Sequence, residues 1–279
     1  MAVKQPLKAI GLMSGTSADG IDVAYLESDG LAISLLGSWA NYSYSGEFKD
    51  RLRSIQSSPI NYKEVEAELT LLHSHAVENF LDNNNLSSKE IDLVGFHGHT
   101  IKHDPDSAVS KQIGDGKLLA NKLKITVLND FRSNDVIHGG QGAPLTPIFH
   151  AKLTENLEKP LAVLNIGGVA NVTWIGIGEE NLLAFDTGPG NAMIDDWILQ
   201  HGLGEYDVDG AIAARGSTNL SVLNTFLKHP YFKRKPPKSL DRNEFSLQLA
   251  EQCNLEDGAA TLSSFAVETI KQSQVYFPT

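Results

Sequence analysis

Two stretches of the sequence share the same pattern, and this repetition constrains the fold more than any other feature. Residues 7–26 contain an apolar run, a turn with glycines and a second apolar run, and residues 161–177 repeat that order. Each half of the chain is therefore expected to begin with a β-hairpin. Two such turns facing one another would hold the phosphates of a nucleotide from both sides, whereas an accidental likeness between two common hairpins would carry no function.

The first of these turns, GLMSGTSADGID at residues 11–22, is more polar than a hairpin requires. One or two glycines supply the positive φ angles of a hairpin, but this turn also carries hydroxyl and carboxylate side chains. Backbone amides and hydroxyls form anion sites suited to phosphate, and an aspartate can reach a phosphate-bound Mg²⁺. A polar loop that only closes the hairpin is the alternative, and the stretch matches neither a Walker A loop nor a GxGxxG motif.

Length and cysteine content set the broad class of protein. A chain of 279 residues can form one large domain or two, and we expect two lobes, residues 1–158 and 159–279. The single cysteine, Cys253, excludes a disulfide framework. The N-terminal residues lack the apolar segment of a secretion signal, so we expect a cytoplasmic protein.

Charge and hydropathy argue against two classes of partner. The net charge of −11 disfavours nucleic acid, whose binding depends on lysine and arginine side chains that neutralise many phosphates. Residues 160–178 carry no charge, but glycine and asparagine interrupt them, which favours two buried strands over a membrane span. The most basic stretch, KRKPPK at residues 233–238, is interpreted as a solvated surface connection.

Strand-like runs alternate with helical periodicities along the chain, which predicts an α/β protein with mixed sheets flanked by helices. Within residues 62–81, apolar side chains recur at steps of three and four and therefore share one helical face. We expect strands near residues 7–13, 21–27, 31–42, 91–97, 125–129, 161–166, 170–177 and 181–186. We expect further helices at residues 116–123, 145–157, 189–202, 217–228, 244–253 and 257–273.

Two polar segments, GFHGHT at residues 95–100 and NDFRSNDVIHGGQGAPL at residues 129–145, each follow an apolar strand. Ligands of α/β sheets bind at the carboxyl ends of strands, so these segments are expected to contact a polar substrate. Their candidate side chains are those of His97, His99, Asp130, Arg132 and Asp135. The nearby histidines, with His103, also suggest zinc, but no HExxH helix or cysteine accompanies them, and hydrogen bonding to substrate is favoured.

A third chemical segment is LLAFDTGPGNAMIDDWI at residues 182–198. Asp186 is expected to end a strand, and Pro189 precedes a helix. An aspartate held on a rigid strand beside a helix is well placed to act as a general base. The alternative is that Asp186 only caps the turn that follows it.

Five motifs together resemble the anhydro-N-acetylmuramic acid kinases of bacterial cell-wall recycling. They are GLMSGTSADGID, GFHGHT, NDFRSNDVIHGGQGAPL, NIGGVANVT and FDTGPGNAMIDDW, and the resemblance covers essentially the whole chain. It implies the two-lobed fold shared by actin, sugar kinases and heat-shock chaperones, with duplicated phosphate-binding hairpins. Two departures stand out: His99 occupies a position where the family generally has Gln, and the family continues beyond VYFPT, which implies an incomplete second lobe.

The resemblance also implies a reaction. ATP with Mg²⁺ phosphorylates O6 of 1,6-anhydro-N-acetylmuramic acid while water opens the anhydro bridge, giving N-acetylmuramic acid 6-phosphate. Asp186 matches the carboxylate that activates this water, as one carboxylate does in an inverting glycosidase. The positions implied for the nucleotide are Gly15, Thr16, Ser17, Ala18, Asp19, Gly20, Ile21, Asp22, Gly167 and Gly168. Those implied for the sugar are His97, His99, Asp130, Arg132, Gly190 and Asn191. From its charge and position, Arg132 is expected to pair with the lactyl carboxylate.

Two other functions remain open at this point. One is a sugar-binding or regulatory relic of that kinase which no longer turns over ATP. The other is a hydrolase that uses Asp186 without a nucleotide, against which the paired hairpins argue. The resemblance implies small-molecule partners and a homodimer, with no nucleic acid and no membrane.

Overall fold

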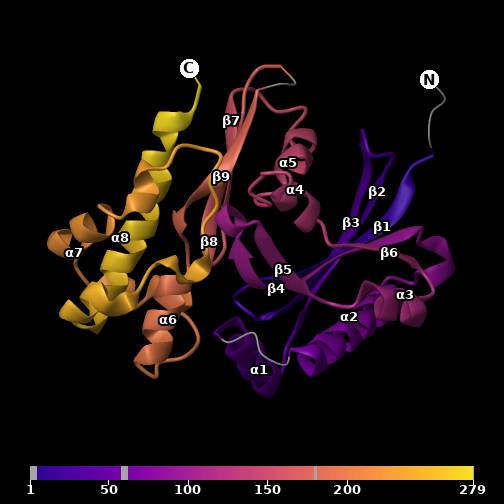
Figure 1. Ribbon diagram of the computed structural model, residues 1–279, viewed down its shortest axis with the longest axis horizontal. Helices are drawn as coiled ribbons and strands as arrows, with labels where there is room; N and C mark the ends of the chain where they lie inside the picture. The colour runs from indigo at the N-terminus through magenta and orange to yellow at the C-terminus, as the bar shows by residue number, and fades with distance from the viewer. Residues whose placement is uncertain (1–4, 58–61, 179–180, 279) are drawn as a thin grey trace. The chain divides into compact units, whose positions relative to one another are not determined.

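The computed structural model describes residues 5–57, 62–178 and 181–278 (Figure 1). Its contacts divide the chain into two compact units, Met1–Gly142 and Ala143–Thr279, and each is described here by itself. The expected α/β class with mixed sheets flanked by helices is confirmed. The lobe boundary expected at residue 158 stays a prediction, although helix α5 (Pro147–Leu153) packs on strands of the second unit.

The first unit is built on a six-stranded sheet with the order β3-β2-β1-β4-β5, in which β6 also pairs with β4. The strands are β1 (Leu7–Ser14), β2 (Gly20–Ser28), β3 (Ile33–Ser43), β4 (Leu93–Asp104), β5 (Val109–Ile113) and β6 (Thr126–Asn129). Strand β1 is antiparallel to β2 and parallel to β4, so the sheet is mixed. The expected hairpin of residues 7–26 is therefore present.

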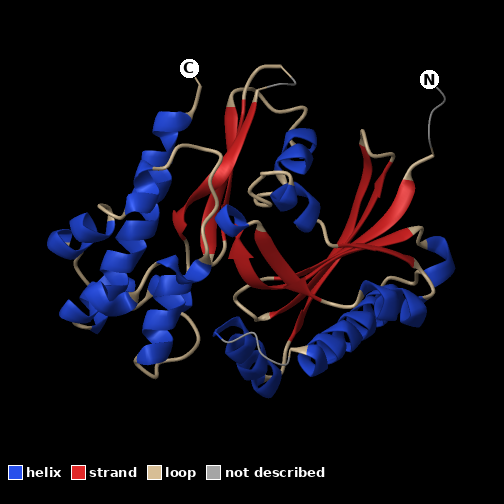
Figure 2. Ribbon diagram, viewed as in Figure 1, coloured by secondary structure: helices blue, strands red, loops and turns tan. Residues whose placement is uncertain are grey.

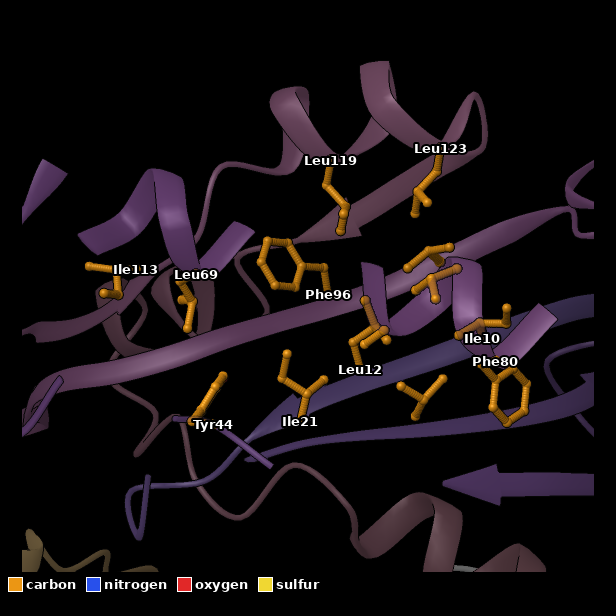
Figure 3. Packing of buried hydrophobic residues seen from close by; sticks show 14 of the residues in the cluster. Ile10, Leu12, Ile21, Tyr44, Leu69, Phe80, Phe96, Ile113, Leu119 and Leu123 are labelled. Atoms are coloured by element: carbon orange, nitrogen blue, oxygen red, sulfur yellow. The ribbon is translucent and has the colours of Figure 1, made fainter. Parts of the chain in front are cut away.

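Helices α1 (Gly46–Ser57), α2 (Lys63–Asn83), α3 (Gly116–Leu123) and α4 (Ser133–Ile137) accompany this sheet. The helix expected at residues 62–81 is confirmed as α2, and its apolar face packs on the sheet, where Phe80 and Leu69 join Ile10 of β1 and Phe96 of β4 in one core (Figure 3). Burial of such side chains contributes about 2 kcal/mol each. Helix α1 and strand β5 were not expected from the sequence.

The second unit contains an antiparallel sheet with the order β7-β8-β9, formed by β7 (Leu161–Ile166), β8 (Val169–Ile175) and β9 (Leu182–Pro189). Its other helices are α6 (Ala192–Gln200), α7 (Leu220–Phe226) and α8 (Leu255–Ser273), and α8 packs on β8, β9, α6 and α7 (Figure 2). The core there is aromatic, with the rings of Phe226 and Phe265 stacked 4.8 Å apart. The second expected hairpin is thus also present.

Three expectations about this unit are wrong. The helix expected at residues 244–253 is replaced by two 3-10 turns, because Ser246 is extended and its hydroxyl accepts the amide of Gln248, which starts a new turn. The helix expected at residues 145–157 is only the short α5. Asp186 does not end its strand, since β9 continues to Pro189.

In the part of the chain that the structure describes, no helix is long and apolar enough to cross a membrane.

Candidate functional site

Residues 15–19 form the turn between β1 and β2. The amide of Ala18 donates to the carbonyl of Gly15 over 3.0 Å, and Ala18, rather than a glycine, adopts the left-handed conformation, with φ of 56°. A Cβ atom on Gly20 would lie 2.6 Å from the carbonyl oxygen of Tyr42, whereas one on Gly15 would meet nothing closer than 3.5 Å. Gly20 is therefore required by packing, and Gly15 is not.

The other predicted nucleotide residues differ in exposure. Ala18 and Ile21 have buried side chains, so only their backbones can face a ligand. The carboxylates of Asp19 and Asp22 are exposed and accept hydrogen bonds from Ser17 and Asn41, each over 2.9 Å. Both carboxylates lie near enough to Tyr44 to raise the pKa of its hydroxyl, although burial is the larger cause. The turn thus presents two acidic groups and a set of amides at one end of β1.

A buried chain of hydrogen bonds supports this turn from below. The hydroxyl of Tyr44 donates to Oγ of Ser14 over 2.8 Å, and Oγ of Ser14 lies 3.0 Å from Nδ1 of His99. Burial lowers the pKa of His99 to about 4, so the ring is neutral at physiological pH. His99, expected to contact the substrate, lies in the core and holds the end of β1.

His97, Asp130 and Arg132 come together in the first unit. Nε of Arg132 donates to Nε2 of His97 over 2.8 Å, and another guanidinium nitrogen donates to the carbonyl of Gly142 over 2.6 Å. His97 and Asp130 line a cavity of about 190 Å³ that also involves β5 and the start of α4. Burial and the nearby charge of Arg132 lower the pKa of His97 to about 4, so His97 is a neutral ring that accepts a hydrogen bond from Arg132.

The other residue expected in this segment, Asp135, binds its own loop. Its Oδ2 atom accepts the amide of Gly142 over 2.7 Å. Gly142 has a φ of 64°, a conformation that favours glycine. The loop that carries Arg132 is therefore closed on itself by hydrogen bonds.

The turn between β7 and β8 is bonded to the start of α6. The amide of Gly190 donates to the carbonyl of Gly168 over 2.9 Å, and the amide of Asn191 donates to that of Gly167 over 2.8 Å. A Cβ atom on Gly190 would lie 2.3 Å from the oxygen of Gly167, so only glycine fits. Four residues predicted separately for nucleotide and sugar therefore form one backbone cluster, and the amides of Gly190 and Asn191 already have acceptors.

Asp186 lies on β9 with 6% of its surface exposed. Its Oδ2 atom accepts the amide of Leu240 over 2.8 Å, its own amide donates to the carbonyl of Lys238 over 3.1 Å, and the hydroxyl of Tyr231 donates to its carbonyl over 2.5 Å. A segment more than forty residues later in the sequence thus holds this carboxylate in place.

Asn171 was not singled out in the sequence. It pairs directly with Asp186 across β8 and β9, and its buried Oδ1 atom has no hydrogen-bond partner among the described residues. Paired residues of neighbouring strands project to the same face of a sheet, so an amide and a carboxylate stand side by side. The signal was present in NIGGVANVT, but the register that aligns it with Asp186 is not visible before the strands pair.

Lys238 corrects the interpretation of KRKPPK as a solvated connection, because only 5% of its surface is exposed. Its Nζ atom lies 4.5 Å from the ring centre of Tyr231. Burial lowers the pKa of this amine to about 8. The local sequence does not distinguish Lys238 from the other basic residues of the stretch, and those residues are exposed.

Within residues 5–57, 62–178 and 181–278, no three His, Cys, Asp or Glu side chains form a group that could hold a metal ion. The three histidines considered for zinc make other contacts: His97 with Arg132, His99 with Ser14, and His103 with Ser110.

Comparisons with known proteins give this chain a set of close relatives. The family model described as Anhydro-N-acetylmuramic acid kinase matches residues 7–277. A protein with that name from Paramagnetospirillum magneticum is 47% identical over 273 residues, which cover 97% of this chain and 77% of that protein. Another, from Methylobacterium nodulans, is 48% identical over 289 residues, and the aligned region covers 96% of this chain and 77% of that protein.

Among solved structures, the activator of 2-hydroxyisocaproyl-CoA dehydratase from Clostridium difficile, with bound ADPNP, aligns with 98% of this chain and 77% of its own. The TM-score is 0.45 and the sequence identity is 13%.

Proposed function

Because the chain belongs to the anhydro-N-acetylmuramic acid kinase family, we propose that it phosphorylates 1,6-anhydro-N-acetylmuramic acid with ATP. The γ-phosphoryl group passes to O6 of the sugar while water adds at C1 and the anhydro bridge breaks. The products are N-acetylmuramic acid 6-phosphate and ADP, and the reaction serves peptidoglycan recycling in the cytoplasm. The observation that carries the residue assignment is the buried Asp186 carboxylate, which the Leu240 amide holds on β9.

Asp186 acts as the general base in this proposal. One carboxylate oxygen accepts the Leu240 amide, which fixes the orientation of the group. The carboxylate takes a proton from water as the water oxygen bonds to C1. The C1–O6 bond breaks, O6 bonds to the γ-phosphorus, and the bond from that phosphorus to the β-phosphate oxygen breaks. The Asn171 amide, which pairs with Asp186, is suited to orient the same water.

The first hairpin turn binds the nucleotide phosphates in this proposal. Backbone amides of this turn other than that of Ala18, which donates to Gly15, supply donors, and the room beside Gly15 lets a phosphate oxygen approach the backbone. Mg²⁺, when bound, neutralises charge on the phosphates. Asp19 and Asp22 would hold it, and their oxygen ligands suit the ion, which usually takes one or two carboxylates and completes its shell with phosphate and water.

The sugar is assigned to the cavity lined by His97 and Asp130. Arg132 supplies positive charge beside it for the lactyl carboxylate, and its bond to His97 fixes the direction of its guanidinium group. His99 supports the phosphate turn through Ser14 in this scheme, so its effect on the sugar is indirect.

The test is a reaction of the chain with the sugar, ATP and Mg²⁺ in H₂¹⁸O. We expect N-acetylmuramic acid 6-phosphate with one ¹⁸O atom at C1, because water supplies that oxygen. Ring opening without ATP would replace the proposal with a hydrolase, and sugar binding without product would replace it with a non-catalytic relic. The proposal also includes the homodimer that the resemblance implies, and sedimentation of the same sample tests it.

A further inference from the structure

Lys238 is a buried charged side chain that the proposed mechanism does not use. It lines a cavity of about 270 Å³ in the second unit, beside Thr187 of β9 and Thr269 of α8. Its Nζ atom lies 4.5 Å from the ring centre of Tyr231, 5.4 Å from that of Tyr276 and 5.7 Å from that of Phe185. Aromatic faces attract a cation most strongly where water is excluded, so the three rings hold the amine in the interior.

The three rings belong to three different parts of the second unit. Phe185 precedes Asp186 on β9, Tyr231 lies in the 3-10 turn Pro230–Lys233, and Tyr276 lies in the turn that follows α8. Two of them also bind backbone: the Tyr231 hydroxyl donates to the carbonyl of Asp186, and the Tyr276 hydroxyl donates to that of Arg234 over 3.1 Å. The amine therefore stands at the point where these parts meet.

The backbone of Lys238 is bonded to the proposed base. The carbonyl of Lys238 accepts the amide of Asp186, and two residues later the amide of Leu240 donates to the Asp186 carboxylate. Residues 238–240 thus form a clasp, defined by these two bonds, that runs along β9. A Lys238 side chain that left its aromatic surroundings for solvent would pull one end of the clasp away.

The charged groups around the amine come from several elements. Asp186 on β9 stabilises the ammonium, Arg234 opposes it, and the rings of Tyr231 and Tyr276 face it. The lining residues from α8 are uncharged: Thr269, Gln272 and Ser273. Burial outweighs the attraction of Asp186 and lowers the pKa to about 8, so the amine loses its charge just above neutral pH.

We propose that Lys238 is a positioning residue, whose amine, held by three aromatic rings, fixes the clasp on β9 and so keeps the Leu240 amide on the Asp186 carboxylate. The inference rests on the role of Asp186 in the proposed function. In this inference, a basic residue far from Asp186 in sequence fixes the orientation of the general base.

Kinetics of three variants test the proposal. Lys238→Met fills the same space without charge, Lys238→Arg keeps a charge at every accessible pH, and Lys235→Met is the matched control at an exposed lysine of the same stretch. We expect Lys238→Met to lower kcat roughly tenfold with KM for the sugar nearly unchanged. Because an amine that leaves this pocket for solvent regains its ordinary pKa, the closed clasp gains stability as the pH rises above 8. The free energy of opening at the Leu240 amide should therefore rise with pH in the wild type and stay constant in Lys238→Met and Lys238→Arg.

Amide hydrogen exchange at Leu240, followed by NMR, tests the clasp without any activity. We expect about tenfold faster exchange in Lys238→Met and wild-type exchange in Lys235→Met. Leu240 exchange at the wild-type rate in Lys238→Met would overturn the inference. Wild-type turnover in Asp186→Asn would overturn the proposed catalytic role instead, and the exchange result would still decide whether Lys238 holds the clasp.

Discussion

The substitution Asp186→Asn separates the chemical role of the carboxylate from its structural role. Asp186→Asn keeps the size of the side chain and an oxygen for the Leu240 amide, but the amide group cannot take a proton from water. We expect kcat to fall by about 10² or more, while sugar affinity measured by calorimetry stays within about twofold. Near-normal turnover would remove Asp186 from the mechanism.

The buried charge of Lys238 should lower the free energy of unfolding of the protein. The pKa of the folded-state amine is about 8, below the ordinary 10.5, so at pH 7 both states hold the proton and the folded state bears the burial penalty. Its aromatic contacts offset part of that penalty. We expect Lys238→Met to raise the free energy of unfolding at pH 7 by about 1 kcal/mol.

Denaturant titrations across pH check the sign of this effect. Between pH 8 and 10.5 the unfolded wild type binds the proton that the folded protein has released, so wild-type stability rises with pH. The advantage of Lys238→Met should therefore shrink over that range. A variant that is less stable than the wild type at pH 7 would contradict the prediction.

At the scale of elements, substitutions at the two glycines of the first hairpin turn should separate effects on ATP binding from effects on folding. Gly15→Val places its Cβ no nearer than 3.5 Å to a neighbour, whereas Gly20→Val forces a Cβ to within 2.6 Å of the Tyr42 carbonyl. We expect Gly15→Val to keep the wild-type Tm and weaken ATP binding at least tenfold, with sugar binding unchanged. Gly20→Val should lower the Tm by several degrees. Equal loss of both ligands in Gly15→Val would favour a turn that only closes the hairpin.

The elements also show what the sequence could predict. Helix α2 and both hairpins were predictable because their apolar patterns are local. Phe48, Leu52 and Ile55 recur at helical spacing, so α1 was also predictable from its local sequence. Strand β5 has only two apolar residues and takes its form from pairing with β4. Propensity alone also fails at residues 244–253, where the hydroxyl of Ser246 caps a new turn and interrupts the helix.

The candidate site was only partly predictable for the same physical reason. Asp186 could be named from its motif, but the burial of Lys238 and the contact of His99 with Ser14 depend on residues far apart in the sequence. A neutral buried histidine and a surface histidine have the same local pattern. Their roles follow only from the partners that folding brings to them.

At the scale of the whole molecule, buried histidines are concentrated in the first unit. Burial lowers the pKa values of His73, His97 and His99 to about 4, below the ordinary 6.5. Between pH 6.5 and 4 the unfolded chain binds protons that the folded unit does not, so stability present at neutral pH is lost on acidification. In the second unit the pKa of His150 is also lowered by burial, but this ring is half-buried.

The first unit should therefore open before the second as the pH falls, and segment-resolved hydrogen exchange between pH 7 and 4.5 checks this order. Replacing His99 by Gln removes one titrating ring while leaving an amide to bond Ser14, so proton uptake on unfolding at pH 5.5 should fall by about one. His75→Gln is the matched control, because His75 is exposed on α2 close to the buried His73. If the second unit exchanges first, or if His99→Gln unfolds with the wild-type pH slope, the buried histidines do not govern the acid stability of this chain.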